Sequence, residues 1–413
     1  MLGFILKLNN YFLIMDSREK VSGLLLTLAI FFISFGSFGS FVDNFNQSIF
    51  VLLISIPVLY LYRDKIKLGY SFFWLLIISS IMCWVSMVSN LPDEGRVWGR
   101  FISIICIFVF SFTSYLYLSN KNKYFLVLSL ISLFGLLHFL LLMNGLIINL
   151  MVKNYNILES LTFFGNIRHY SAFLSICFLT SYVLSFFSKK FKKLFVVNSI
   201  LLLFFLLFLG TRSSYLSLFF VIIILSIYMY CFKIKFFFKS LFIFLSAFIL
   251  QLMFGSSSHS LGFFNSINRT VSGNVSSGRV LIWKETWKYI EKNFWGYGGD
   301  AFLQLNIGMK ALGGVFVQAH NAFFQIVLEW GVIVFIMLVI YFLILSYKCF
   351  YWFRDKYVFT IYLMILNILI ISIFDGVFYY IFEIFFLILF ISLLNARLNF
   401  LSTAKEALFT KSI

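Results

Sequence analysis

Lys192-Lys-Leu-Phe-Val-Val-Asn-Ser-Ile-Leu-Leu-Leu-Phe-Phe-Leu-Leu-Phe-Leu209 is one of many apolar runs in this chain that match the thickness of a bilayer. A helix needs roughly 20 residues to cross the hydrocarbon core, whereas a barrel strand needs about half as many and alternates apolar with polar side chains. The chain lacks such alternation, and 62% of its 413 residues are hydrophobic against 11% charged. The sequence therefore predicts an all-α integral membrane protein.

The apolar runs predict about twelve transmembrane helices. They cover residues 21–41, 47–62, 69–90, 97–118, 124–152, 170–188, 192–209, 213–232, 236–254, 319–346, 357–374 and 377–396. Lys and Arg gather in every second loop, and the positive-inside rule puts those loops and both chain ends on the cytoplasmic side. The polar run from Asp16 to Lys20, with no small-residue cleavage site, favours an interfacial N-terminal segment over a removed signal peptide.

These spans divide the chain into three parts. Residues 1–254 hold the first nine helices, 255–318 form the longest outer loop, and 319–413 hold the last three helices and a cytoplasmic tail. Within the long loop, apolar residues recur at helical spacing at Val280, Trp283, Trp287, Ile290 and Phe294. The pattern predicts an amphipathic helix on the membrane surface.

The net charge of +17 is scattered over short loops, which indicates topology determinants near anionic lipid and not a nucleic-acid partner. The five cysteines lie in or beside predicted spans without CxxC spacing, so neither disulfides nor a metal site is indicated. We expect no cofactor.

Gly210-Thr-Arg-Ser-Ser214 forms an outer turn just before a span. The guanidinium of Arg212 and the first N–H groups of the following helix would point at one place, which suits phosphate oxygens. The alternative is an arginine that reaches the head groups and anchors a helix end.

Ser276-Ser-Gly-Arg-Val-Leu-Ile-Trp283 opens the amphipathic helix. Gly278 lets the backbone turn, and Arg279 then stands at the helix start. A cation there is unfavourable with the helix dipole unless an anion is present, which favours an anion site over a surface helix that merely meets lipid phosphate.

Ala319-His-Asn-Ala-Phe-Phe-Gln-Ile-Val-Leu-Glu-Trp-Gly331 returns the long loop to the membrane. The imidazole of His320 has a suitable pKa to take a proton from a hydroxyl, and Gln318, Asn321 and Gln325 crowd beside it. The alternative is a polar interfacial residue without a role in catalysis.

Further polar residues stand near the outer face. Asn166, Arg168 and His169 in Phe164-Gly-Asn-Ile-Arg-His-Tyr170 would bind sugar hydroxyls or diphosphate. Arg100 lies a full turn deeper in its span than an anchor requires, and we expect Arg100, Asn321 and Asp375 to bind the substrate as well. Asp375 places a carboxylate near membrane depth, where ionisable groups are costly, although a solvated turn residue is an equal alternative.

Three segments occur in order before, within and after the long loop. They are Gly-Thr-Arg-Ser at 210–213, Ser-Gly-Arg-x-x-x-Trp at 277–283, and His-Asn at 320–321 followed by Gly331. Together they resemble the superfamily of O-antigen ligases and O-antigen polymerases, which are polytopic, GT-C-like glycosyltransferases. The resemblance covers roughly residues 160–395. It departs from the ligase pattern at Val334, where the family has a small or hydroxylated residue.

The resemblance implies a role for each matching residue. Arg212 and Arg279 would hold the diphosphate of an undecaprenyl-diphosphate-linked glycan, and His320 would act as general base or orient the acceptor hydroxyl. It implies an inverting transfer at the periplasmic face of the bacterial inner membrane. Two arginines would stabilise the leaving diphosphate without a metal.

Three functions stay open. A ligase would use a lipid A–core sugar as acceptor, and the single dominant outer loop favours it. A polymerase would use another lipid-linked repeat unit at nearly the same donor site. A lipid-linked-sugar flippase or other transporter also fits twelve spans, but only two prolines and no evident repeat speak against it.

Overall fold

The computed structural model describes residues 16–35, 41–66, 70–119, 123–151, 166–230, 234–254, 262–271 and 278–410. Every regular element in these ranges is a helix. Nine of the described helices are long and apolar enough to cross a membrane, and two shorter apolar helices, Phe73–Met87 and Arg212–Tyr228, accompany them. The prediction of an all-α polytopic membrane protein is confirmed.

Each of the twelve predicted spans falls on a helix. These helices are α2 (Ser17–Phe35), α3 (Phe41–Leu61), α4 (Tyr70–Met87), α5 (Glu94–Leu118), α6 (Tyr124–Met151), α7 (Ile167–Phe187), α8 (Lys192–Leu209), α9 (Arg212–Tyr230), α10 (Ile234–Phe254), α15 (Ala322–Tyr351), α16 (Lys356–Phe374) and α17 (Ile381–Thr410). Helix α2 begins with Arg18, Glu19 and Lys20 and is not among the nine. Most of the predicted outer loop at 153–169 lies outside the described residues.

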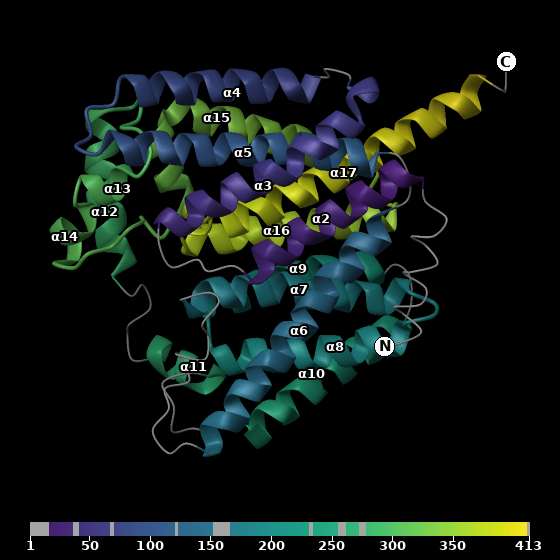
Figure 1. The fold of residues 1–413 in the computed structure, drawn as a ribbon. Helices are drawn as coiled ribbons and strands as arrows, with labels where there is room; N and C mark the ends of the chain where they lie inside the picture. Colours follow the sequence, from purple (N-terminus) through teal and green to yellow (C-terminus); the bar gives the residue numbers. More distant parts are fainter. Residues whose placement is uncertain are drawn as a thin grey trace. The chain divides into compact units, whose positions relative to one another are not determined.

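The chain divides into two compact units, each built from separate stretches of sequence. The first unit holds α2, α6 to α10, the short helix α11 (Phe263–Val271), and residues Leu366–Ile371 of α16. Helices α6, α7 and α8 form its centre, and α7 is buried along almost its whole length. These three helices are packed against one another (Figure 1). Asn198 of α8 donates to Ser132 and Ser181 oxygens at 2.9 Å, which joins α8 to α6 and α7.

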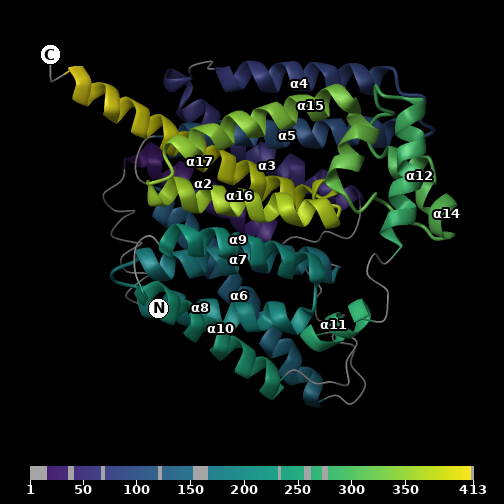
Figure 2. The same cartoon turned by 180° about the vertical axis from the view of Figure 1, so that it is seen from behind.

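The second unit holds α3, α4, α5, α15, α17, most of α16, and the helices of the long loop. Helix α5 contacts both α3 and α17. Helix α4 contacts both α5 and α15, and these three helices run side by side in Figure 2. Three short elements, α12 (Arg279–Lys292), α13 (Ala301–Gln304) and α14 (Ile307–Leu312), gather at one end of these helices.

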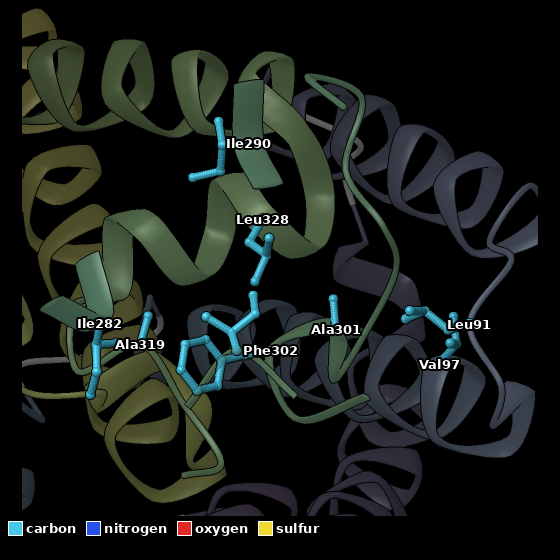
Figure 3. Packing of buried hydrophobic residues seen from close by; sticks show 9 residues of the cluster. Leu91, Val97, Ile282, Ile290, Ala301, Phe302, Ala319 and Leu328 are labelled. Carbon is cyan, nitrogen blue, oxygen red and sulfur yellow. The ribbon is translucent and has the colours of Figure 1, made fainter. Parts of the chain in front are cut away.

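Helix α12 is the predicted amphipathic helix, and it uses two faces. Ile282 and Ile290 are buried in a hydrophobic cluster that also contains Phe302 of α13 and Leu328 of α15 (Figure 3), and Thr286 is buried on the same helix. The predicted stripe assigned Ile290 to the membrane, but the structure buries it inside the protein. The exposed face instead carries Val280, Leu281 and Trp287, so α12 retains an apolar surface that suits a membrane interface.

Helix α15 is interrupted at Gly331, a feature that the predicted continuous span from 319 to 346 lacks. Gly331 has φ 85° and ψ 167°, which only glycine adopts without strain. The residues that follow α12 satisfy the backbone groups that the interruption releases. Tyr297 N and Gly298 N donate to the carbonyls of Leu328 and Glu329 at 2.9 Å, and Val332 N donates to Phe294 O at the same distance, so the loop is joined to α15 by its main chain.

Candidate functional site

Arg279 is the first residue of α12 and forms an ion pair that the sequence did not reveal. Gly278 precedes it with φ 78°, as the predicted turn requires. Its Nη2 lies 2.9 Å from Oδ1 of Asp375, which follows α16, and the two side chains are 16% and 6% exposed. The structure thus brings together two residues that the sequence proposed separately. The first two residues of the Ser276–Trp283 motif lie outside the described residues.

His320 stands in a left-handed conformation, with φ 52°, between two anchored peptides. On its N-terminal side, Ala319 N donates to Oε1 of Gln325 at 2.9 Å, and Trp283 Nε1 donates to Ala319 O at 3.0 Å. The ring of Phe316 meets the half-buried imidazole edge to face. A non-glycine residue at positive φ destabilises the folded state by about 1 kcal/mol or more. The hydrogen bonds of the neighbouring residues hold His320 in this unfavourable conformation.

Asn321 anchors the other side of His320 by capping α15. Its Oδ1 accepts from Phe323 N at 2.9 Å and from Phe324 N at 3.1 Å, while its Nδ2 donates to Ile373 O at 3.0 Å. The predicted role of Asn321 was substrate binding, and both ends of its amide are engaged in holding the backbone. In this structure it therefore positions His320 relative to the end of α16.

The turn after α16 packs directly on the segment before His320. A Cβ on Gly376 would come 1.2 Å from Oε1 of Gln318, so only glycine fits there. That Oε1 is buried and has no hydrogen-bond partner among the described residues. The turn that carries Asp375, the partner of Arg279, thus also contacts the segment before His320. The two predicted catalytic residues of this unit, Arg279 and His320, are therefore both next to this turn.

Arg100 takes part in a buried network below this turn. Its Nε lies 3.7 Å from Oε2 of Glu329, with side chains 5% and 2% exposed. Its guanidinium also donates to Tyr379 O at 2.6 Å and to Phe378 O. The predicted role of Arg100 was substrate binding, but its guanidinium is occupied by these protein partners. It joins α5, α15 and the short helix η3 (Val377–Tyr379), which precedes α17.

Glu329 and Asp300 complete this network, and neither was predicted to be a site residue. Oε1 of Glu329 accepts from Gln325 Nε2 at 2.6 Å and from Asp300 N at 3.2 Å. The fully buried Asp300 carboxylate lies 2.9 Å from Arg96 Nη1 and accepts from the Tyr379 hydroxyl at 2.9 Å. Burial raises the pKa of Asp300 despite these two donors. The available signal was a carboxylate one helical turn after Gln325 in an apolar span.

The remaining predicted residues lie in the first unit. Asn166 caps α7 by accepting from Arg168 N at 2.9 Å, with Arg168 half-buried and His169 buried in the first turn. Arg212 is the first residue of α9 and is half-buried, as the turn at Gly210 predicted. A Cβ on Gly210 would lie 2.6 Å from a carbonyl oxygen of Gly262, so this turn packs closely on the start of α11.

A comparison with protein families matches residues 197–339 to a family model described as O-antigen ligase. The matched region contains Arg212, Arg279, His320 and Glu329, and it ends beyond the interruption at Gly331. No curated protein and no solved structure matches the chain. The resemblance read from the three sequence segments is confirmed at the level of the superfamily.

Proposed function

On the premise that this chain belongs to the O-antigen ligase superfamily through residues 197–339, we propose that it is a glycosyltransferase that acts at the periplasmic face of its membrane. The donor is a glycan on undecaprenyl diphosphate, and the acceptor is a hydroxyl of a lipid A–core sugar. The protein acts in the bacterial inner membrane, with both termini cytoplasmic and the site facing the periplasm.

The observation that carries this proposal is the fixed placement of His320 beside the turn that holds Arg279. The Nε2 or Nδ1 atom of the imidazole takes the proton of the acceptor hydroxyl. The acceptor oxygen then forms a bond to the anomeric carbon as the bond from that carbon to the diphosphate oxygen breaks. Attack opposite the leaving group inverts the configuration, and the diphosphate departs with the bonding pair.

Arg279 stabilises the charge that grows on the diphosphate, and Asp375 holds the guanidinium in place. Donors aimed at developing charge lower the barrier most when they are positioned in advance, and removal of one such donor costs roughly 100- to 1,000-fold in turnover. Arg212 is the second arginine that the family resemblance assigns to the diphosphate. We assign it the same role on that resemblance.

A polymerase is the second candidate, and Val334 favours it. Where the ligase pattern has a small or hydroxylated residue, Val334 is 1% exposed and packs with Ile78, Met82 and Trp330. A valine methyl in this buried position offers no hydrogen bond. The chain therefore departs from the ligase pattern at a buried, apolar position.

The test uses purified protein, an undecaprenyl-diphosphate-linked glycan, and lipid A–core either present or absent. Glycan attached to lipid A–core alone would support the ligase, and longer lipid-linked glycans without lipid A–core would support the polymerase. His320→Ala and Arg279→Ala should each lose at least about 100-fold in turnover. Lys288→Ala, an exposed cation two turns along α12, is the matched control and should retain activity.

No transfer under either condition by the parental protein would reject the enzyme and favour a flippase. Parental turnover by Arg279→Ala, with correct membrane insertion, would reject the assigned site.

A further inference from the structure

We infer that the second unit contains a binding site for an anionic phospholipid, whose head-group end lies away from the proposed transferase site. The site is a cavity of about 810 Å³ among α4, α5, α15 and α17. Its walls are mostly aliphatic and aromatic, with Ile78, Phe108, Leu338 and Ile388 among the lining residues. An apolar cavity at membrane depth offers water few hydrogen-bond partners, so hydrocarbon chains fill it more favourably than water does.

Positive charge lies at one end of this cavity. Lys65, in the short helix η1 (Arg63–Lys65) before α4, and Lys348, in the last turn of α15, both line it and are exposed. Ser119, Asn399 and Ser402 line the cavity near the corresponding ends of α5 and α17. A basic pocket between transmembrane helices, with hydroxyl and amide groups beside it, suits a phosphate head group.

The opposite end is polar, but its two charged side chains are paired with each other. Arg100, Gln325 and Glu329 line it, and the arginine is already paired with the glutamate and with two main-chain carbonyls. From Val332 to Lys348, the uninterrupted part of α15 rises roughly 24 Å at about 1.5 Å per residue, which is most of the hydrocarbon thickness. Charge complementarity therefore seats the head group at the lysine end, with the acyl chains directed towards Arg100.

The same charge distribution argues against the donor lipid as occupant. Gln325 bonds to the segment that carries His320, so the proposed reaction takes place near the Arg100 end. A donor tail in this cavity would carry its diphosphate at that end, away from both lysines. Both lysines lie in segments that the positive-inside pattern assigns to the cytoplasmic leaflet, which is rich in anionic lipid.

The experiment is native mass spectrometry of the full-length protein, delipidated in detergent and then given phosphatidylglycerol, phosphatidylcholine with the same chains, or undecaprenyl phosphate. We expect retained phosphatidylglycerol, and a roughly 10- to 30-fold weaker affinity in Lys65→Ala/Lys348→Ala, because each lysine near a lipid phosphate contributes modestly. The matched control is Lys189→Ala/Lys190→Ala, two exposed lysines of another basic loop, which should bind like the parental protein.

Leu338→Trp, which fills the cavity without altering charge, should also reduce retention. Equal retention of phosphatidylcholine, or unchanged phosphatidylglycerol affinity in the lysine variant, would overturn the inference. Displacement of phosphatidylglycerol by undecaprenyl phosphate at equal concentration would also overturn it and would assign the cavity to the polyprenyl lipid. None of these outcomes depends on whether the protein transfers glycan.

Discussion

Replacement of Glu329 by Gln tests whether the buried network around Arg100 is ionic. The substitution preserves the shape of the side chain and keeps an oxygen that can accept from Asp300 N and Gln325 Nε2. It removes only the negative charge that faces Arg100 Nε at 3.7 Å. Any loss of stability therefore reports on charge compensation and not on packing.

The expected loss follows from the burial of both side chains, which are 5% and 2% exposed. Removing one partner of a buried ion pair costs about 3–5 kcal/mol, since the other charge stays buried without compensation. Arg100 still donates to the carbonyls of Phe378 and Tyr379, which lowers the expected cost to about 3 kcal/mol. Arg100→Gln should destabilise comparably, because it strands the carboxylate.

The assay is reversible unfolding in mixed micelles of the two single variants and the double variant Arg100→Gln/Glu329→Gln. The double variant should be about 1.5–3 kcal/mol more stable than the sum of the single losses predicts, since neither charge remains stranded. Glu285→Gln, which breaks an exposed pair with Lys288 on α12, serves as control and should not change stability measurably. A Glu329→Gln loss below about 1 kcal/mol, or strictly additive losses, would mean that Glu329 is uncharged in the native protein.

Three further predictions concern single positions. Gly331→Ala should cost at least about 2 kcal/mol of unfolding free energy and lower the yield of folded protein, because its Cβ would lie 2.4 Å from Trp295 O; Gly313→Ala, at φ 69° with open space around it, should cost about 1 kcal/mol. Burial raises the pKa of Asp355, but the hydrogen bonds from Arg397 at 2.6 and 3.1 Å and from two backbone N–H groups outweigh it, so its net pKa lies below the ordinary 3.8. Asp355 should therefore stabilise the protein above about pH 4 and lose this contribution as the pH falls further, and Asp355→Asn should flatten the acid side of the stability profile; a parallel profile would refute this. Asp375→Asn should preserve folding but lower turnover about 10-fold, because the guanidinium that it orients is no longer held; unchanged turnover would assign Asp375 a purely structural role.

The sequence predicted the helices well because membrane depth leaves few alternatives. An apolar run of bilayer length must satisfy its backbone internally, so each of the twelve predicted spans became a helix. The interruption of α15 could not be read from Gly331 alone, since glycine is common in membrane helices. It depends on a partner segment, residues 294–298, that lies outside the helix in sequence.

The candidate site was predicted in its residues but not in its pairings. Arg279 and Asp375 were each chosen for their chemistry, yet their contact joins the start of α12 to the end of α16. Arg100 was predicted to bind substrate because it lies deep in a span. In the structure its guanidinium instead contacts Glu329 and two main-chain carbonyls at that depth. Its partner Glu329 was not predicted, although a carboxylate one helical turn after Gln325 in an apolar span is a signal of a buried polar contact.

The interruption at Gly331 explains how the loop and the membrane helix can hold one site. Phe294, Tyr297 and Gly298 follow α12 directly, and their main-chain hydrogen bonds to residues 328–332 fix the C-terminal end of α12 on α15. Trp283 fixes the other end through Ala319, next to His320. Both attachments use backbone atoms on the α15 side, so they tolerate changes of side chain there. This arrangement lets neighbouring side chains vary while the spacing between Arg279 and His320 is retained.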